Sequence, residues 1–170
     1  MNYKMVHKIA FGGKMGVGKD FAVEYLMNKY SGNKLSFAKS LYDILHFAQK
    51  TCGFREEKDR QFLQFIGTDW ARQKNPDVWV EKLQESVVPD ENCFISDLRF
   101  PNELRSLKKN GWICVKIIRK HQENREGTGS VNHSSESLLE SIQNSEWDYI
   151  IENNGSPDDF YTKLEEIIST

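Results

Sequence analysis

Near the N-terminus of this 170-residue chain stands the stretch Gly12-Gly13-Lys14-Met15-Gly16-Val17-Gly18-Lys19-Asp20. From Gly13 onward its spacing fits G-x-x-x-x-G-K, the first seven positions of the P-loop, whose glycines turn backbone N–H groups toward phosphate oxygens and whose lysine reaches the terminal phosphates. The eighth position is normally a serine or threonine that binds Mg²⁺ through its hydroxyl, and here it is Asp20. A carboxylate is also a hard oxygen ligand, but it brings negative charge toward phosphate. The stretch predicts a phosphate-binding loop with an unusual last residue.

The flanks of this stretch fit the context that a P-loop requires. Apolar residues at Met5, Val6 and 9–11 predict a short strand before the glycines. Residues 19–30 then carry apolar side chains at helical spacing, and Gly32 lies just beyond them. Strand, glycine loop and helix therefore follow in the required order. The plainer alternative is a glycine-rich turn with an exposed lysine, and the flanks favour the phosphate-binding loop.

The composition bounds the size and class of the protein. Its 170 residues, 38% of them hydrophobic, suffice for one compact domain with a substantial core. A net charge of -2 argues against stable binding of long nucleic acids, since such binding needs clustered Lys and Arg. The sequence has neither a run of the roughly 20 apolar residues that span a bilayer nor a signal-peptide core, so we expect a cytoplasmic protein without membrane contacts. Cys52, Cys93 and Cys114 are isolated and indicate neither a disulfide nor a zinc site.

Beyond the glycine loop, short apolar runs alternate with segments of helical spacing. This alternation predicts an α/β fold of three layers, a parallel five-stranded sheet flanked by helices. The expected strands are residues 5–11, 34–38, 93–95, 112–118 and 147–151. The expected helices are residues 19–30, 41–50, 55–67, 76–86, 101–110, 134–142 and a last one after Ser156. Gly67 is expected to end the third helix and Asn75 to cap the fourth.

Chemistry-bearing residues follow several of these strands. The glycine loop follows the first strand, Asp97 ends the third, Arg119 ends the fourth, and Asn153-Asn154-Gly155 ends the fifth. Because ligands of parallel sheets bind at the carboxyl ends of the strands, we expect these residues to gather at one edge.

Phosphoryl transfer needs charge neutralisation, a metal and two substrates held in line. Lys19 and the loop amides would hold the donor phosphates, while Asp20 and Asp97 are the candidate Mg²⁺ ligands. For Asp97 the alternative is a salt bridge with Arg99. Arginines that could bind phosphate, each of which could equally be a solvated surface residue, are Arg60, Arg72, Arg99, Arg119 and Arg125. Trp70 and Trp79 fit a core as well as a platform for a nucleobase.

Several short segments stand in a fixed order from about residue 8 to the C-terminus. They are Gly13 to Asp20, Arg60 with Leu63-Gln64, Gly67-Thr68-Asp69-Trp70 with Arg72, Pro76-Asp77 with Trp79-Val80, Ser96-Asp97-Leu98-Arg99-Phe100-Pro101-Asn102-Glu103, His133-Ser134-Ser135-Glu136, and Asn153-Asn154-Gly155. Together they resemble the deoxynucleoside monophosphate kinases of tailed bacteriophages. In that family an aspartate also stands at the last P-loop position.

The resemblance implies a nucleoside monophosphate kinase that uses ATP and Mg²⁺ to phosphorylate a deoxynucleoside 5′-monophosphate for DNA precursor synthesis. It implies one P-loop kinase domain, 1–170, with an acceptor-binding helical insertion at about 36–80 and a short lid at about 119–133. The residues implied in catalysis are Lys19, Asp97, Arg99 and Arg119. Those implied in ATP binding are Gly13, Lys14, Gly16, Val17, Gly18, Lys19, Asp20, Asn153, Asn154 and Gly155. Those implied in acceptor binding are Lys39, Arg60, Gln64, Thr68, Asp69, Trp70, Arg72 and Trp79.

Two other functions stay open. A kinase of another small phosphorylated molecule, such as the animal phosphomevalonate kinases, would share the Lys-Asp loop ending and part of the arginine set. A nucleotide-binding module without turnover would use the loop alone, although it has no need of arginines aimed at a transferring group. The sequence leaves the accepted bases and the oligomeric state open, a homodimer included.

Overall fold

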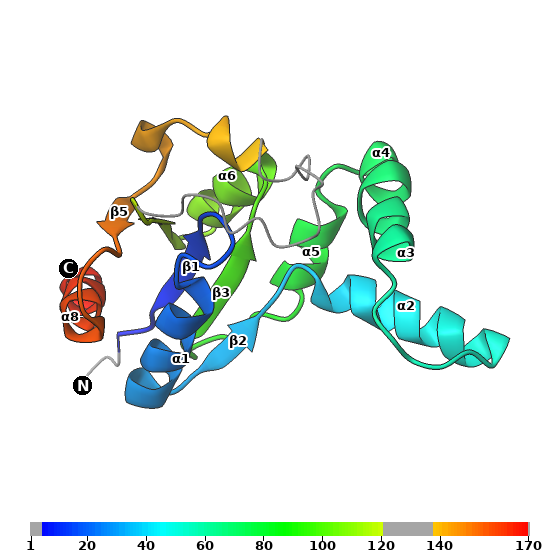
Figure 1. The fold of residues 1–170 in the computed structure, drawn as a ribbon, viewed down its shortest axis with the longest axis horizontal. Helices are drawn as coiled ribbons and strands as arrows, with labels where there is room; N and C mark the ends of the chain where they lie inside the picture. The colour runs from blue at the N-terminus through cyan, green and yellow to red at the C-terminus, as the bar shows by residue number, and fades with distance from the viewer. Residues whose placement is uncertain (1–4, 121–137, 170) are drawn as a thin grey trace. The chain divides into compact units, whose positions relative to one another are not determined.

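The fold is shown in Figure 1 as a computed structural model that describes residues 5–120 and 138–169. The chain forms two compact units. The first, here called the P-loop unit, comprises Met1–Lys34 and Val88–Thr170 and contains the glycine loop. The second, here called the helical unit, is Leu35–Val87 and contains the predicted acceptor region.

A five-stranded sheet in the order β2-β3-β1-β4-β5 is the centre of the P-loop unit. Its strands are β1 (Lys8–Gly12), β2 (Asn33–Leu35), β3 (Cys93–Leu98), β4 (Ile113–Ile118) and β5 (Tyr149–Glu152). β1 pairs in parallel with β3 on one side and β4 on the other, and β4 pairs in parallel with β5. The glycine loop therefore leaves the central strand, with the carboxyl ends of β3 and β4 beside it. The predicted α/β class is confirmed.

Helices cover both faces of this sheet (Figure 1). α1 (Lys19–Tyr30) and α8 (Pro157–Ile168) pack with Phe11, Val115 and Ile117 in one buried cluster. α6 (Pro101–Lys109) lies on the other face, where the Cys114 thiol donates to the Leu104 carbonyl at 3.9 Å. Because side chains alternate along a strand, β4 supplies Val115 and Ile117 to one layer and Cys114 to the other. The three layers are those that the sequence predicts.

The helical unit consists of α2 (Lys39–Cys52), α3 (Arg60–Gln64), a π-helical turn η1 (Phe65–Trp70), α4 (Ala71–Lys74) and α5 (Val78–Gln84). Gly67 is buried within the π-helical turn, where an added Cβ would lie 3.2 Å from Cδ1 of Leu41. The Gly67 carbonyl accepts a hydrogen bond from the Trp79 indole N–H at 2.9 Å. Gly67 therefore lies close against the Leu41 side chain of α2, and its backbone carbonyl joins the π-helical turn to α5.

Some predicted element ends are wrong. The helix expected at 55–67 begins only at Arg60, where the Asp59 carboxylate accepts from Phe62 N at 2.9 Å, and Gly67 does not end it. Asn75 does not cap α5, since the N-cap residue is Asp77. Asn75 instead follows α4, and its side-chain oxygen accepts from Asp77 N at 3.0 Å. β3 continues past the predicted end to Leu98.

The predicted start of α8 is confirmed. Ser156 caps α8 by accepting a hydrogen bond from Asp159 N at 3.2 Å, with Pro157 as the first helical residue. The three cysteines are free thiols; Cys93 and Cys114 are buried and Cys52 is exposed. Burial raises the pKa of the Cys114 thiol to about 12, so that thiol stays neutral. Within 5–120 and 138–169, every helix is too short or too polar to span a bilayer.

Candidate active site

The glycine loop is held in shape by close packing around its glycines. Gly13, Gly16 and Gly18 all have positive φ, and Gly18 is the residue before α1. A Cβ on Gly13 would lie 2.4 Å from the Ile117 carbonyl oxygen, and one on Gly18 would lie 2.7 Å from Nδ2 of Asn153. One residue earlier, a Cβ on Gly12 would lie 2.4 Å from Cη2 of Trp147. At Gly13 and Gly18 both the positive φ and the surrounding atoms therefore disfavour a side chain.

The Lys19 side chain lies over the loop that precedes it. Its ammonium donates to the Gly13 carbonyl at 2.7 Å and to the Lys14 carbonyl at 2.6 Å. These bonds hold the cation above the loop whose glycines permit inward-turned N–H groups, which is the arrangement that a P-loop lysine needs in order to reach the terminal phosphates. The structure therefore brings Lys19 and the loop together as the sequence predicts.

Asp20 lies in the first turn of α1 between two side-chain donors. Its Oδ1 accepts from Lys34 Nζ at 2.8 Å and from Ser96 Oγ at 2.7 Å. The Lys34 bond, followed by the Ser96 bond, lowers the pKa of the Asp20 carboxyl below its usual value, so it is charged at neutral pH. Oδ2 accepts no hydrogen bond from the described residues. Neither contact follows from sequence spacing, and neither Lys34 nor Ser96 is among the predicted site residues.

Asn153 and Asn154 support the loop and the end of β4. The Asn153 side-chain amide donates to the Val17 carbonyl at 2.8 Å, and its backbone N–H donates to the Ile118 carbonyl at 2.8 Å. The Asn154 side-chain oxygen accepts from Lys120 N at 2.7 Å. Gly155 follows at the start of the turn into α8, where an added Cβ would lie 2.6 Å from Asp159 Oδ2. The segment Asn153-Asn154-Gly155, which is predicted to bind ATP, therefore stabilises the P-loop from the carboxyl end of β5.

A basic pocket of about 390 Å³ adjoins the loop within the P-loop unit. Gly13, Lys14 and Val17 line it from the loop, and the end of β4 adds Arg119 and Lys120. Lys14 pairs with Glu140 at 2.6 Å on the same pocket wall. Cations and loop backbone in one hollow suit an anionic ligand. The rest of the predicted lid, including Arg125 and His133, lies outside the described residues.

At the end of β3, Asp97 is half-buried and Arg99 is exposed. The Arg99 backbone N–H donates to the buried Glu103 carboxylate at 2.9 Å, and the Phe100 N–H donates to the same oxygen at 3.0 Å. Glu103 thus fixes the turn between β3 and α6, and the Arg99 side chain projects from that turn. The glutamate of the Asp-x-Arg-Phe-Pro-Asn-Glu segment therefore has a local structural role.

Magnesium fits the donor groups of this unit. Among the described residues no three His, Cys, Asp or Glu side chains cluster into a metal cage. Mg²⁺ does not require one, because it is usually bound by one or two carboxylates together with substrate phosphates and waters. Asp20, through its second oxygen, and Asp97 are the carboxylates that could serve.

In the helical unit, the predicted acceptor-binding residues are mostly on the surface. Those classed as exposed are Lys39, Arg60, Gln64, Asp69 and Trp70, while Thr68 and Arg72 are half-buried. The Arg72 guanidinium donates to the Pro76 carbonyl at 3.4 Å. Trp79 differs from the other predicted residues, since it is only 3% exposed and its indole N–H donates a hydrogen bond to the Gly67 carbonyl. The structure places Trp79 in the core of this unit, the alternative that its aromatic character left open.

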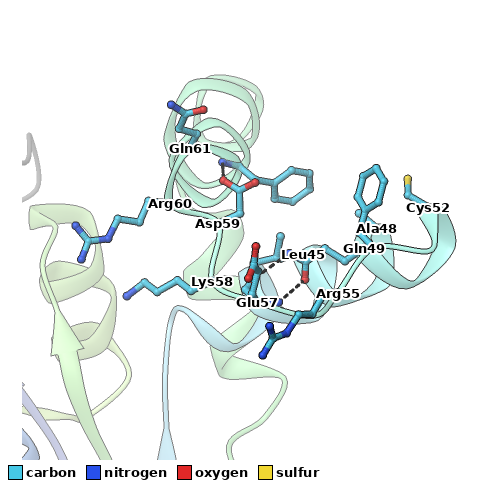
Figure 2. A pocket seen from close by; sticks show the side chains of 12 residues that line it. Leu45, Ala48, Gln49, Cys52, Arg55, Glu57, Lys58, Asp59, Arg60 and Gln61 are labelled. Atoms are coloured by element: carbon cyan, nitrogen blue, oxygen red, sulfur yellow. Dashed lines mark hydrogen bonds between the residues drawn. The ribbon is translucent and has the colours of Figure 1, made fainter.

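Figure 2 shows a pocket of about 630 Å³ in the helical unit, between α2 and the segment that leads into α3. Gln49 fixes that segment with two bonds, donating to the Glu57 carbonyl at 2.8 Å and accepting from Glu57 N at 3.3 Å (Figure 2). The lining carries three cations, Arg55, Lys58 and Arg60, and two carboxylates, Glu57 and Asp59. Of the predicted acceptor residues, Arg60 is the one that lines this pocket.

The chain is similar in structure to known proteins. The dephospho-CoA kinase of Campylobacter jejuni superposes with a TM-score of 0.58 and 16% identity, over 97% of this chain and 96% of that one. The fold is that of the P-loop kinases. At this identity the likeness concerns the fold alone, and it confirms the predicted fold class.

Two viral proteins are related to the chain in sequence, whereas no protein-family model matches it. An uncharacterised protein of Ictalurid herpesvirus 1 is 35% identical over 140 residues, which are 78% of this chain and 58% of that protein's length. A protein of Acanthamoeba polyphaga mimivirus is 28% identical, over 90% of this chain and 91% of its own, and bears the provisional name deoxynucleotide monophosphate kinase. Neither comes from a bacteriophage, so the phage affiliation stays a prediction.

Proposed function

We propose that the protein is a deoxynucleoside monophosphate kinase, which transfers the γ-phosphoryl group of ATP to a deoxynucleoside monophosphate. The observation that carries the proposal is the Lys19-Asp20 end of the glycine loop, with Lys19 over the loop and Asp20 held beside Ser96 at the end of β3. Support comes from the P-loop kinase fold and from the provisional name of the mimivirus relative, which covers nearly the whole chain.

The P-loop unit would bind ATP. The loop amides and Lys19 would hold the β- and γ-phosphates, and Asn153 would keep the loop in place through the Val17 carbonyl. Arg119 and Lys120 offer further cations beside the loop. Asp20 and Asp97 would hold Mg²⁺ or its waters, and the metal would neutralise charge on the phosphates.

Acceptor binding is assigned to the helical unit. Arg60 and Arg72 would bind the acceptor phosphate or base, with Gln64, Thr68, Asp69, Trp70 and Lys39 around them. Arg60 lines a pocket with Arg55 and Lys58, and these three cations outnumber the two carboxylates of the lining, Glu57 and Asp59. Trp79 would contribute from the core, by fixing Gly67 next to Thr68 and Asp69.

In the reaction, an oxygen of the acceptor phosphate forms a bond to the γ-phosphorus of ATP while the bond between that phosphorus and the β,γ-bridging oxygen breaks. The products are a deoxynucleoside diphosphate and ADP. Lys19 would compensate the charge that develops on the bridging oxygen, and Arg99 would do the same on the transferring group.

A panel of acceptors tests the proposal. Purified protein with ATP and Mg²⁺ is incubated with each deoxynucleoside monophosphate, and ADP and the matching diphosphate are measured. We expect diphosphate formation from at least one member of the panel. Activity on phosphomevalonate with none on the panel would assign a different acceptor on the same fold. Tight ADP binding without transfer to any phosphate acceptor would identify a nucleotide-binding module.

A further inference from the structure

Lys34 lies beside Asp20 in the P-loop unit. It is exposed on the three-residue strand β2, and its Nζ lies 2.8 Å from Asp20 Oδ1. Asp20 directly follows the P-loop lysine, and its side chain is 73% exposed. A carboxylate in this place is accessible to whatever binds the loop.

The charge on Asp20 opposes phosphate binding. In an ordinary P-loop the corresponding side chain is a neutral hydroxyl, so the loop and its lysine meet the phosphates without repulsion. Two like charges about 4 Å apart repel each other by about 1 kcal/mol even at the dielectric constant of water, and by more near a protein surface. A loop that ends in aspartate therefore binds phosphate more tightly when a cation pairs with that carboxylate.

We propose that Lys34 is this cation, a charge-compensating residue that allows a loop ending in Asp20 to bind nucleotide phosphates. The pairing is specific, because both donors to Asp20 bind the same oxygen: Lys34 supplies the charge, and Ser96 supplies a neutral hydroxyl 2.7 Å away. Both bonds are made to Oδ1, and Oδ2 accepts no hydrogen bond from the described residues.

The inference rests on the proposed binding of nucleotide by the loop, and it does not depend on which acceptor is phosphorylated. Its test is therefore ADP binding, measured by calorimetry once in EDTA and once with saturating Mg²⁺. The variant is Lys34→Met, which keeps the aliphatic stem and removes the charge. We expect the dissociation constant for ADP in EDTA to rise about five- to tenfold, because Asp20 then repels the phosphates.

With Mg²⁺ present, the metal can neutralise the unpaired Asp20 carboxylate in Lys34→Met. The loss of ADP affinity should therefore be smaller in Mg²⁺ than in EDTA. The ratio of the dissociation constant in EDTA to that in Mg²⁺ should therefore rise in Lys34→Met. General damage to the loop would raise both constants together and leave their ratio unchanged, which would overturn the inference. Lys34→Arg should keep the wild-type ratio because it retains the charge.

A double variant separates charge compensation from direct contact. Asp20→Asn combined with Lys34→Met removes both charges, and its ADP affinity in EDTA should return to within about twofold of the wild-type value. If the affinity stays low in the double variant, Lys34 itself binds phosphate and the inference is wrong. Lys82→Met is the matched control, since Lys82 is an exposed lysine paired with Glu85 at 2.9 Å in the helical unit. It should leave both constants unchanged.

The outcomes also separate this inference from the proposed function. If the ADP constants shift as expected while no deoxynucleoside monophosphate is phosphorylated, Lys34 keeps its role and the acceptor assignment fails. If transfer occurs and the constants do not shift, the kinase assignment holds and Lys34 has no such role.

Discussion

The P-loop unit and the helical unit carry their candidate functional side chains in different ways. In the P-loop unit, Lys19 is bonded to two loop carbonyls, Asp20 to Lys34 and Ser96, and Asn153 to Val17. In the helical unit, Arg60 and Gln64 lie exposed on a five-residue helix that runs into a π-helical turn. In the first set Lys19 is fixed by its own loop, and Asp20 and Asn153 are fixed by residues distant in sequence, whereas the second set depends on short local elements.

This difference matches the two tasks that a kinase has to divide. Charge stabilisation on a transferring phosphoryl group requires groups that are already in place, because reorganisation during the reaction would raise the barrier. Recognition of an acceptor can instead use side chains that adjust on binding. Substitutions in the P-loop unit should therefore affect turnover and nucleotide affinity, and those in the helical unit should affect the acceptor.

The largest effect is expected for Lys19→Ala. Loss of a cation at the transferring phosphates should reduce kcat by about 10²- to 10³-fold, while circular dichroism shows an unchanged fold. Lys29→Ala is the control, since Lys29 lies on the same helix and pairs with Glu165 at 2.9 Å. Equal activity of Lys19→Ala and wild type would show that the P-loop unit does not take part in phosphoryl transfer.

Arg60→Met tests whether the helical unit binds the acceptor. If Arg60 binds the acceptor phosphate, its loss should raise the KM for the deoxynucleoside monophosphate about tenfold, which is the effect of one charge-assisted hydrogen bond. The KM for ATP should change less than twofold. Lys50→Met, on the exposed side of α2, should change neither value. A rise in the KM for ATP alone would assign Arg60 to the nucleotide and contradict the division of tasks.

Asn153→Ala asks whether the P-loop depends on its tertiary support. Without the amide that donates to Val17, the dissociation constant for ADP should rise about fivefold, corresponding to one hydrogen bond of about 1 kcal/mol. Asn110→Ala, which removes a bond to Ser106 at the end of α6, is the control. An unchanged ADP affinity in Asn153→Ala would show that the loop keeps its shape alone.

Trp79→Phe should have the smallest effect, and only within the helical unit. It removes the hydrogen bond to Gly67 and should lower the free energy of unfolding by about 1 kcal/mol, as measured by urea denaturation. ADP affinity should not change. Trp70→Phe is the matched control because Trp70 is 48% exposed. A loss of ADP affinity in Trp79→Phe would show that the two units are energetically coupled.

The sequence predicted most of the fold because its signals are local. The glycine loop, the apolar runs of β1, β3 and β4, and the Ser156-Pro157 start of α8 each lie within about a dozen residues. The continuation of the helix through Gly67 could not be predicted, because a glycine ordinarily marks a helix end. Here the reason for the glycine is the Leu41 side chain, which is distant in sequence.

The contacts within the candidate site could not be predicted from the sequence. Lys19 and Asp20 follow from the loop pattern alone. The pairing of Asp20 with Lys34 spans 14 residues, and that of Asn153 with Val17 spans 136. Neither separation has a periodicity that points to contact, so these interactions depend on the packing of β2 and β5 around the central strand.

Gly12 precedes the P-loop pattern and is nevertheless fixed by its neighbours, since a Cβ there would lie 2.4 Å from the Trp147 ring. In evolutionary terms, positions 12 and 147 should vary together. Homologues with alanine or a larger residue at position 12 should have lost the indole at position 147, and homologues with the tryptophan should keep the glycine. A library selected only for folding should show the same covariation, independently of any selection for nucleotide binding.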